Sequence, residues 1–113
     1  EKMLADYILG CVYRDMHEAP MALEYYNKAT ELADTTAKDC DYATLCRIYS
    51  QMGFLFAKQH LPHQELASLD KAVKYAYLAK DTLNAIRYYQ NKQAIYASQN
   101  KLILLLDVIL SII

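Results

Sequence analysis

The stretch LGCVYRDMHEAPMALEYYNKA, residues 9–29, predicts two helices joined by a tight turn. Apolar residues recur at helical spacing on both sides of Pro20, which interrupts the pattern within HEAP. Small and aromatic residues alternate along the stretch, at Gly10, Tyr13, Ala22, Tyr26 and Ala29. Small residues let a second helix approach closely, and rings fill the space beside them. The stretch therefore predicts a helical hairpin.

The hairpin pattern returns 43 residues later, where Gly53 matches Gly10 and Pro62 interrupts the second copy. A third copy aligns less clearly, at a shift of 40 residues from the second, with Gln93 in the place of Gly53. The chain is therefore predicted to be all-α. Asp39 and Asp81 are the predicted N-caps of two helices. About six helices are expected, near residues 3–15, 21–33, 39–58, 64–79, 81–99 and 101–113.

Composition excludes several classes of function. The 113 residues carry 12 Lys and Arg against 13 Asp and Glu, a net charge of −1, so we expect no direct binding of nucleic acid. Cys11, Cys40 and Cys46 show no disulfide or metal-binding spacing, and we interpret them as free thiols. No signal peptide is recognisable in this sequence. The compartment is left open.

No motif indicates catalysis. His60 and His63 flank a helix-breaking proline without a nearby carboxylate or thiol at ligand spacing, so we interpret them as loop residues. Cys11 and His17 lack any surrounding signature of a nucleophile and its base, and no Gly-rich phosphate loop is present. We predict a protein that is not an enzyme and that uses no cofactor and no metal.

The pattern of Leu9, Gly10, Tyr13, Ala22, Tyr26 and Ala29 resembles the tetratricopeptide repeat, a helix-turn-helix unit of about 34 residues. The resemblance implies a right-handed stack of helical hairpins, a single domain over residues 1–113 and a longer parent protein. Its repeats would cover about residues 3–36, 39–79 and 81–113. Three residues depart from the family: Asp6 stands where a large residue is usual, Glu65 replaces the small residue that corresponds to Ala22, and Asp34 stands where a proline is common. The insert TTAKDCDYA is expected to lengthen the third helix.

The resemblance implies a module that binds a peptide or an extended protein segment in a concave groove. Three helical stripes are predicted to line it, formed by Tyr7, Cys11 and Arg14; by Arg47, Ser50, Phe54 and Lys58; and by Arg87, Gln90 and Ala94. Because arginine binds carboxylates in a bidentate manner, the partner is expected to be acidic. The alternative is that the three arginines pair with Asp15, Asp41 and Asp81.

The C-terminal sequence LILLLDVILSII, residues 102–113, is predicted to pack against a protein rather than to span a membrane. Twelve residues fall short of the ~20 that cross a bilayer, and Asp107 lies among them. Leu105, Ile109 and Ile112 are expected on the inner face of a sixth helix. A homodimer, or contact with a following repeat, would use Leu102, Leu106, Ile109, Leu110 and Ile113.

A second function stays open beside the binding module. The sequence of residues 45–53, LCRIYSQMG, is similar to repeat regions that precede a membrane span and an output domain in bacterial regulators. This resemblance implies a self-association or sensor segment of a signalling or transcription regulator. The module would then lie outside the cytoplasmic membrane, and otherwise in the cytoplasm.

Overall fold

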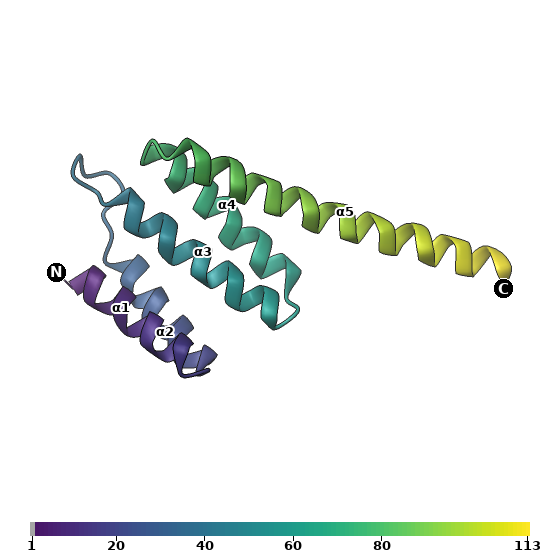
Figure 1. The fold of residues 1–113 in the computed structure, drawn as a ribbon, viewed down its shortest axis with the longest axis horizontal. Coiled ribbons are helices and arrows are strands. Elements are labelled where there is room, and N and C mark those ends of the chain that lie inside the picture. The colour runs from purple at the N-terminus through teal and green to yellow at the C-terminus, as the bar shows by residue number, and fades with distance from the viewer. Residues whose placement is uncertain (1) are drawn as a thin grey trace.

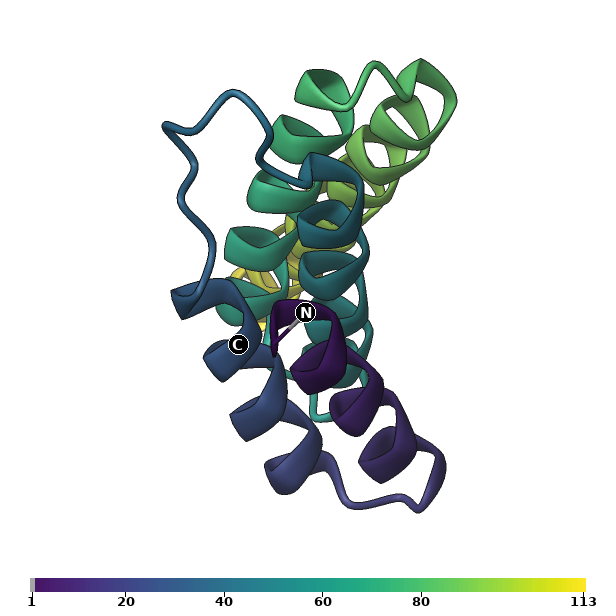
Figure 2. The same ribbon diagram turned by 90° about the vertical axis from the view of Figure 1, so that its left-hand side faces the viewer.

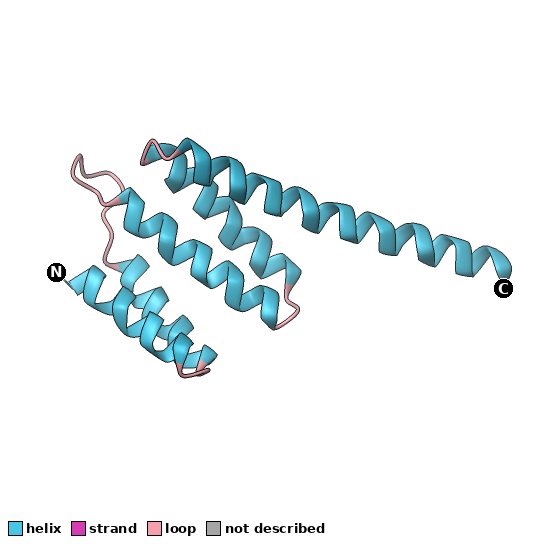
Figure 3. Cartoon of the chain, in the orientation of Figure 1, coloured by secondary structure: helices cyan, strands magenta, loops and turns pink. Residues whose placement is uncertain are grey.

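The computed structural model describes residues 2–113, which form five helices and no strand (Figure 1, Figure 3). The helices are α1 (Lys2–Asp15), α2 (Ala19–Glu31), α3 (Tyr42–Lys58), α4 (Pro62–Leu78) and α5 (Thr82–Ile112). The all-α prediction is confirmed. The expected number of about six helices is not, because the fifth and sixth predicted helices are one.

Two turns of the same design join α1 to α2 and α3 to α4. His17 and His60 adopt left-handed backbone conformations, with φ of 60° and 57°. Immediately after them, the Glu18 N–H donates to the Tyr13 carbonyl at 2.8 Å, and the Leu61 N–H donates to the Phe56 carbonyl at 3.0 Å. These bonds satisfy carbonyls at the end of the first helix, and a proline then opens the second helix of each hairpin.

Aspartates cap the first helices of the later units. The Asp41 carboxylate accepts from the Thr44 N–H at 3.0 Å, and the Asp81 carboxylate accepts from the Asn84 N–H at 3.2 Å. Asp81 was predicted correctly. The prediction of Asp39 was wrong, because α3 begins only at Tyr42. The insert TTAKDCDYA therefore forms most of a connecting loop instead of extending the helix.

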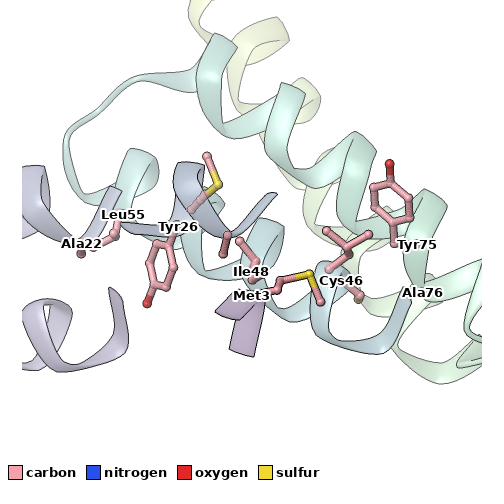
Figure 4. Packing of buried hydrophobic residues seen from close by; sticks show 11 residues of the cluster. Met3, Ala22, Tyr26, Cys46, Ile48, Leu55, Tyr75 and Ala76 are labelled. Atoms are coloured by element: carbon pink, nitrogen blue, oxygen red, sulfur yellow. The ribbon is translucent and has the colours of Figure 1, made fainter. Parts of the chain in front are cut away.

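The helices pack in chain order, with contacts between α1 and α2, α2 and α3, α3 and α4, and α4 and α5. Figure 2 shows the two hairpins side by side, with the loop between them at one end. One core cluster runs from Met3 through Tyr26 and Ile48 to Ala76 (Figure 4). Ala22, Ala29, Ala72 and Ala76 are fully buried. Small side chains at the helix contacts thus let the elements approach closely.

Helix α5 runs without interruption for 31 residues and extends beyond both hairpins (Figure 1). In the repeat alignment Leu102 takes the place of Pro62, so the residue that opens α4 has no counterpart that would start a new helix. Every residue from Asn100 to Ile113 is exposed. Leu105, Ile109 and Ile112 are therefore not on a buried inner face, and that prediction was wrong.

Candidate functional site

A pocket of about 560 Å³ lies where α1, α3, α4 and α5 meet. We call it the central pocket. It is lined by Arg14, Asp15, Ser50, Gln51, Gly53, Phe54, Ala57, Glu65, Leu69, Tyr88 and Asn91. Its volume lies within the range of binding pockets for small molecules and side chains. Three of the predicted groove residues, Arg14, Ser50 and Phe54, are thus brought together.

A second pocket, of about 380 Å³, shares Ala57 and Glu65 with the central pocket. We call it the distal pocket. It continues toward the exposed end of α5 and reaches Leu102. The two pockets adjoin at these shared residues, and α3, α4 and α5 contribute to both.

The central pocket exists because the second hairpin is filled less completely than the first. In the first hairpin the Tyr26 ring is fully buried against Gly10, so that a Cβ at position 10 would lie 2.5 Å from Tyr26 Cδ1. In the second hairpin Leu69 takes the place of Tyr26, and a Cβ on Gly53 would lie 3.7 Å from the nearest Leu69 atoms. Close packing against glycine was predicted for both hairpins, but crowding occurs only at Gly10.

The charged side chains of the central pocket differ in how they are paired. Arg14 Nη2 lies 2.9 Å from an Asp15 carboxylate oxygen, and Arg14 Nη1 donates to Gln51 Oε1 at 2.8 Å. Within residues 2–113, the Glu65 carboxylate forms no ion pair and no side-chain hydrogen bond. Burial raises the pKa of Glu65 above its ordinary value. The pocket's unpaired charge is therefore negative.

Lys58, another predicted groove residue, lies beside the Phe54 ring but lines neither pocket. Phe54 is half exposed, and Lys58 Nζ lies 4.6 Å from the centre of its ring. This distance suits a cation–π contact between residues one helical turn apart. The Phe54 ring therefore offers an apolar surface next to a positive charge.

Tyr7 and Cys11 lie in the core of the first hairpin and not in the central pocket. The Tyr26 hydroxyl donates to Cys11 Sγ at 3.5 Å, and the Tyr7 and Tyr26 ring centroids are 6.1 Å apart. Burial, followed by the bond to Cys11, raises the pKa of Tyr26. These half-buried groups help to hold α1 on α2.

The remaining predicted groove residues lie elsewhere. Arg47 lines a small pocket of about 70 Å³ together with Asp81 and Asn84. Arg87, Gln90 and Ala94 are exposed on α5 and do not line the central pocket. Tyr88 and Asn91 occupy that wall instead, so the groove-facing side of α5 lies one residue further along the chain than predicted.

Eight lining residues of the central pocket were not among the predicted groove residues: Asp15, Gln51, Gly53, Ala57, Glu65, Leu69, Tyr88 and Asn91. The repeat alignment held a usable indication, because Glu65 replaces Ala22 and Leu69 replaces Tyr26. A charged residue where the first hairpin has alanine, together with a leucine where it has tyrosine, indicates a contact between the helices that is open and polar.

The apolar end of α5 is a separate surface. Leu102, Leu106, Ile109, Leu110 and Ile113 are all exposed and, because α5 is continuous, they share one face of the helix. Judged by length and composition alone, α5 is long and apolar enough to cross a lipid bilayer. The twelve-residue length that argued against a span is therefore not the length of the helix.

Between Lys2 and Ile113, no group of three or more His, Cys, Asp or Glu side chains is placed to hold a metal ion. No protein-family model, no curated protein and no solved structure matches the chain. The functional interpretation therefore depends on the molecule's own geometry.

Proposed function

We propose that this chain is a protein-interaction module that holds a peptide or an extended protein segment in the groove formed by the central and distal pockets. The observation that carries the proposal is the central pocket, to which four helices contribute side chains. An open groove that combines apolar side chains with several polar and charged groups suits an extended segment better than a flat surface would.

The proposal includes a tetratricopeptide-like stack. Its support is the equivalent turns at His17 and His60, the repeated prolines and the packing of helices in chain order. In such a stack the first helices of successive hairpins line one concave surface. We assign this role to α1, α3 and the first half of α5, and we assign no chemical step to the groove.

A blocking substitution tests the proposal. A display library of random twelve-residue peptides is selected on the protein, and the affinity of the best peptide is measured by fluorescence anisotropy. Ser50→Trp places a large ring in the central pocket and is expected to weaken binding at least tenfold, about 1.4 kcal/mol. Lys71→Trp is the matched control, because Lys71 is exposed on α4 and lines neither pocket. Equal affinity of both variants would contradict groove binding.

The expected preference for acidic partners has a test of its own. Arg14 is already paired with Asp15, so the preference would have to come from Arg47 and Arg87. The double variant Arg47→Ala, Arg87→Ala should then weaken an Asp- or Glu-rich peptide at least tenfold while the melting temperature stays the same. An unchanged affinity would assign these two arginines to the solvated surface.

We also propose a second candidate, a self-association or sensor segment, because the apolar end of α5 is exposed. Light scattering of the full chain should show a homodimer. Leu106→Lys, on the face proposed for dimer contact, should give a monomer, whereas Val108→Lys, on a different face, should leave the dimer intact. Binding to phosphatidylcholine vesicles that both variants weaken equally would indicate a membrane contact instead and would argue against the dimer.

A further inference from the structure

We infer that the central pocket receives a positively charged side chain, Lys or Arg, of the bound segment, and that Glu65 selects it. The inference rests on the proposed function and adds the chemistry that the groove recognises. At the central pocket it replaces the acidic partner residue that was expected from the arginines with a basic one.

The first ground is the charge left free in the pocket. Arg14 is the one cationic side chain among its lining residues, and both Asp15 and Gln51 already hold its guanidinium. The Glu65 carboxylate has no ion pair or side-chain hydrogen bond within the part of the chain that the structure describes. A ligand cation would therefore find an acceptor there, whereas a ligand carboxylate would have to displace Asp15.

The second ground is the burial of Glu65. This residue is half-buried at the junction of the central and distal pockets, and burial raises the pKa of its carboxyl group. Burial removes hydration from this carboxylate; the N-terminal end of α4 favours its negative charge, but no ion pair or side-chain hydrogen bond replaces the lost water. A cation from a partner would supply the missing interaction, and a partly desolvated pair is stronger than one on the open surface.

The third ground is the wall around the carboxylate. Ala57 and Leu69 line the same pocket, and Tyr88 adds a ring from α5. Lys and Arg carry aliphatic stems that pack on apolar surface while the charged head contacts a polar group. A short acidic or neutral side chain would not use this combination of apolar wall and unpaired carboxylate.

The fourth ground is the contrast with the first hairpin. There, Ala22 and Tyr26 occupy the positions of Glu65 and Leu69, and both are fully buried. The space that would receive a ligand side chain is filled by the protein's own ring. The open volume and the carboxylate therefore occur together, in the second hairpin and not in the first.

Selection of the peptide library on three proteins tests the inference. Peptides selected on the wild type should carry Lys or Arg at one fixed position. Peptides selected on Glu65→Gln should lose this enrichment. Glu31→Gln is the matched control, because it removes the same charge from an exposed residue at the end of α2. It should behave as the wild type does.

The outcomes separate the inference from the proposed function. Selected peptides that bind the groove without a basic residue at a fixed position, or a basic enrichment that persists on Glu65→Gln, would overturn the inference and leave groove binding standing. Failure to select any peptide on the wild type would overturn both. Circular dichroism verifies that each variant is folded.

A double-mutant cycle then locates the contact. Replacing the basic residue of the best peptide by Gln should weaken binding to the wild type at least tenfold and should change binding to Glu65→Gln by less than twofold. An equal loss on both proteins would show that Glu65 does not contact the cation. Leu69→Tyr gives a steric test, since a ring like that of Tyr26 should fill the pocket and abolish binding while the chain stays folded. Retained affinity in Leu69→Tyr would place the cation outside the central pocket.

Discussion

The two hairpins have the same turns but fill the space between their helices differently. A histidine with positive φ stands two residues after the end of each first helix, and each second helix has proline in its first turn. In the first hairpin the Tyr26 ring closes the contact against Gly10, whereas in the second Leu69 leaves room beside Gly53. Two side-chain exchanges, Ala22 to Glu65 and Tyr26 to Leu69, therefore accompany the change from a closed contact to a pocket.

Under the proposed function, the two hairpins divide stability from binding. A fully buried ring contributes more apolar contact than a leucine at the same place. The second hairpin gives up that contact and also places the Glu65 carboxylate in a half-buried position. Residues that break the repeat pattern thus mark a site better than residues that keep it.

Exchanging Tyr26 and Leu69 should have the largest effect on stability, and the two substitutions should differ in their cost. Tyr26→Leu removes a fully buried ring and its bond to Cys11, and is expected to cost about 2–4 kcal/mol of the free energy of unfolding. Leu69→Tyr adds a ring next to an existing pocket and should cost less than ~1.5 kcal/mol. Urea denaturation of both variants measures the difference. Equal losses would mean that the two contacts are packed alike.

Alanine at the two glycines probes the same contrast with a single methyl group. Gly10→Ala places a Cβ against the Tyr26 ring and should destabilise the protein by about 1–3 kcal/mol. Gly53→Ala meets only ordinary contacts with Leu69 and should be stabilising by up to ~1 kcal/mol, because alanine favours the helix. Thermal unfolding gives both values. A destabilising Gly53→Ala would show that the second hairpin is closed as well.

Sequence reasoning found the elements and missed much of the site, for identifiable reasons. Pro20 and Pro62 mark local backbone constraints, so the two hairpins could be predicted from them. Asp39 and Asp41 are two residues apart and carry the same side chain, so both are candidates for the N-cap of α3. The cap is Asp41 because Thr44, three residues later, also donates its hydroxyl to the Asp41 carboxylate. A local pattern cannot rank two such candidates.

The misplaced site residues have a different cause. A shift of one residue rotates a helix by about 100°, which is enough to exchange Arg87 for Tyr88 at the pocket wall. The continuity of α5 likewise depends on the absence of a helix-breaking residue such as proline, rather than on any motif. The shape of a pocket depends on such rotations and on the volumes of facing side chains. Neither can be predicted from hydrophobic periodicity alone.

The turns should respond equally in both hairpins, and this sharpens the comparison by testing what they share. His17→Gly and His60→Gly each remove the penalty of a Cβ in the left-handed region, and each should stabilise the chain by about 0.5–1 kcal/mol. Chemical denaturation of the single variants is the measurement. Effects of opposite sign would show that the turns differ and that the pocket cannot be ascribed to Glu65 and Leu69 alone.

The smallest expected effect concerns the carboxylate that only the second hairpin carries. Because burial raises the pKa of Glu65 in the folded state, folding favours its protonated form. The contribution of this group to stability is fully present below the pKa of the unfolded chain, near pH 4, and is lost as the pH rises through the higher folded value. Glu65→Gln cannot ionise, so its melting temperature should exceed that of the wild type at pH 7, and the difference should shrink as the pH falls toward the pKa of the unfolded chain. Glu31→Gln, at an exposed position, should show no such trend. A difference that stays constant with pH would mean that the pocket does not penalise the charge, and a bound cation would then have little to restore.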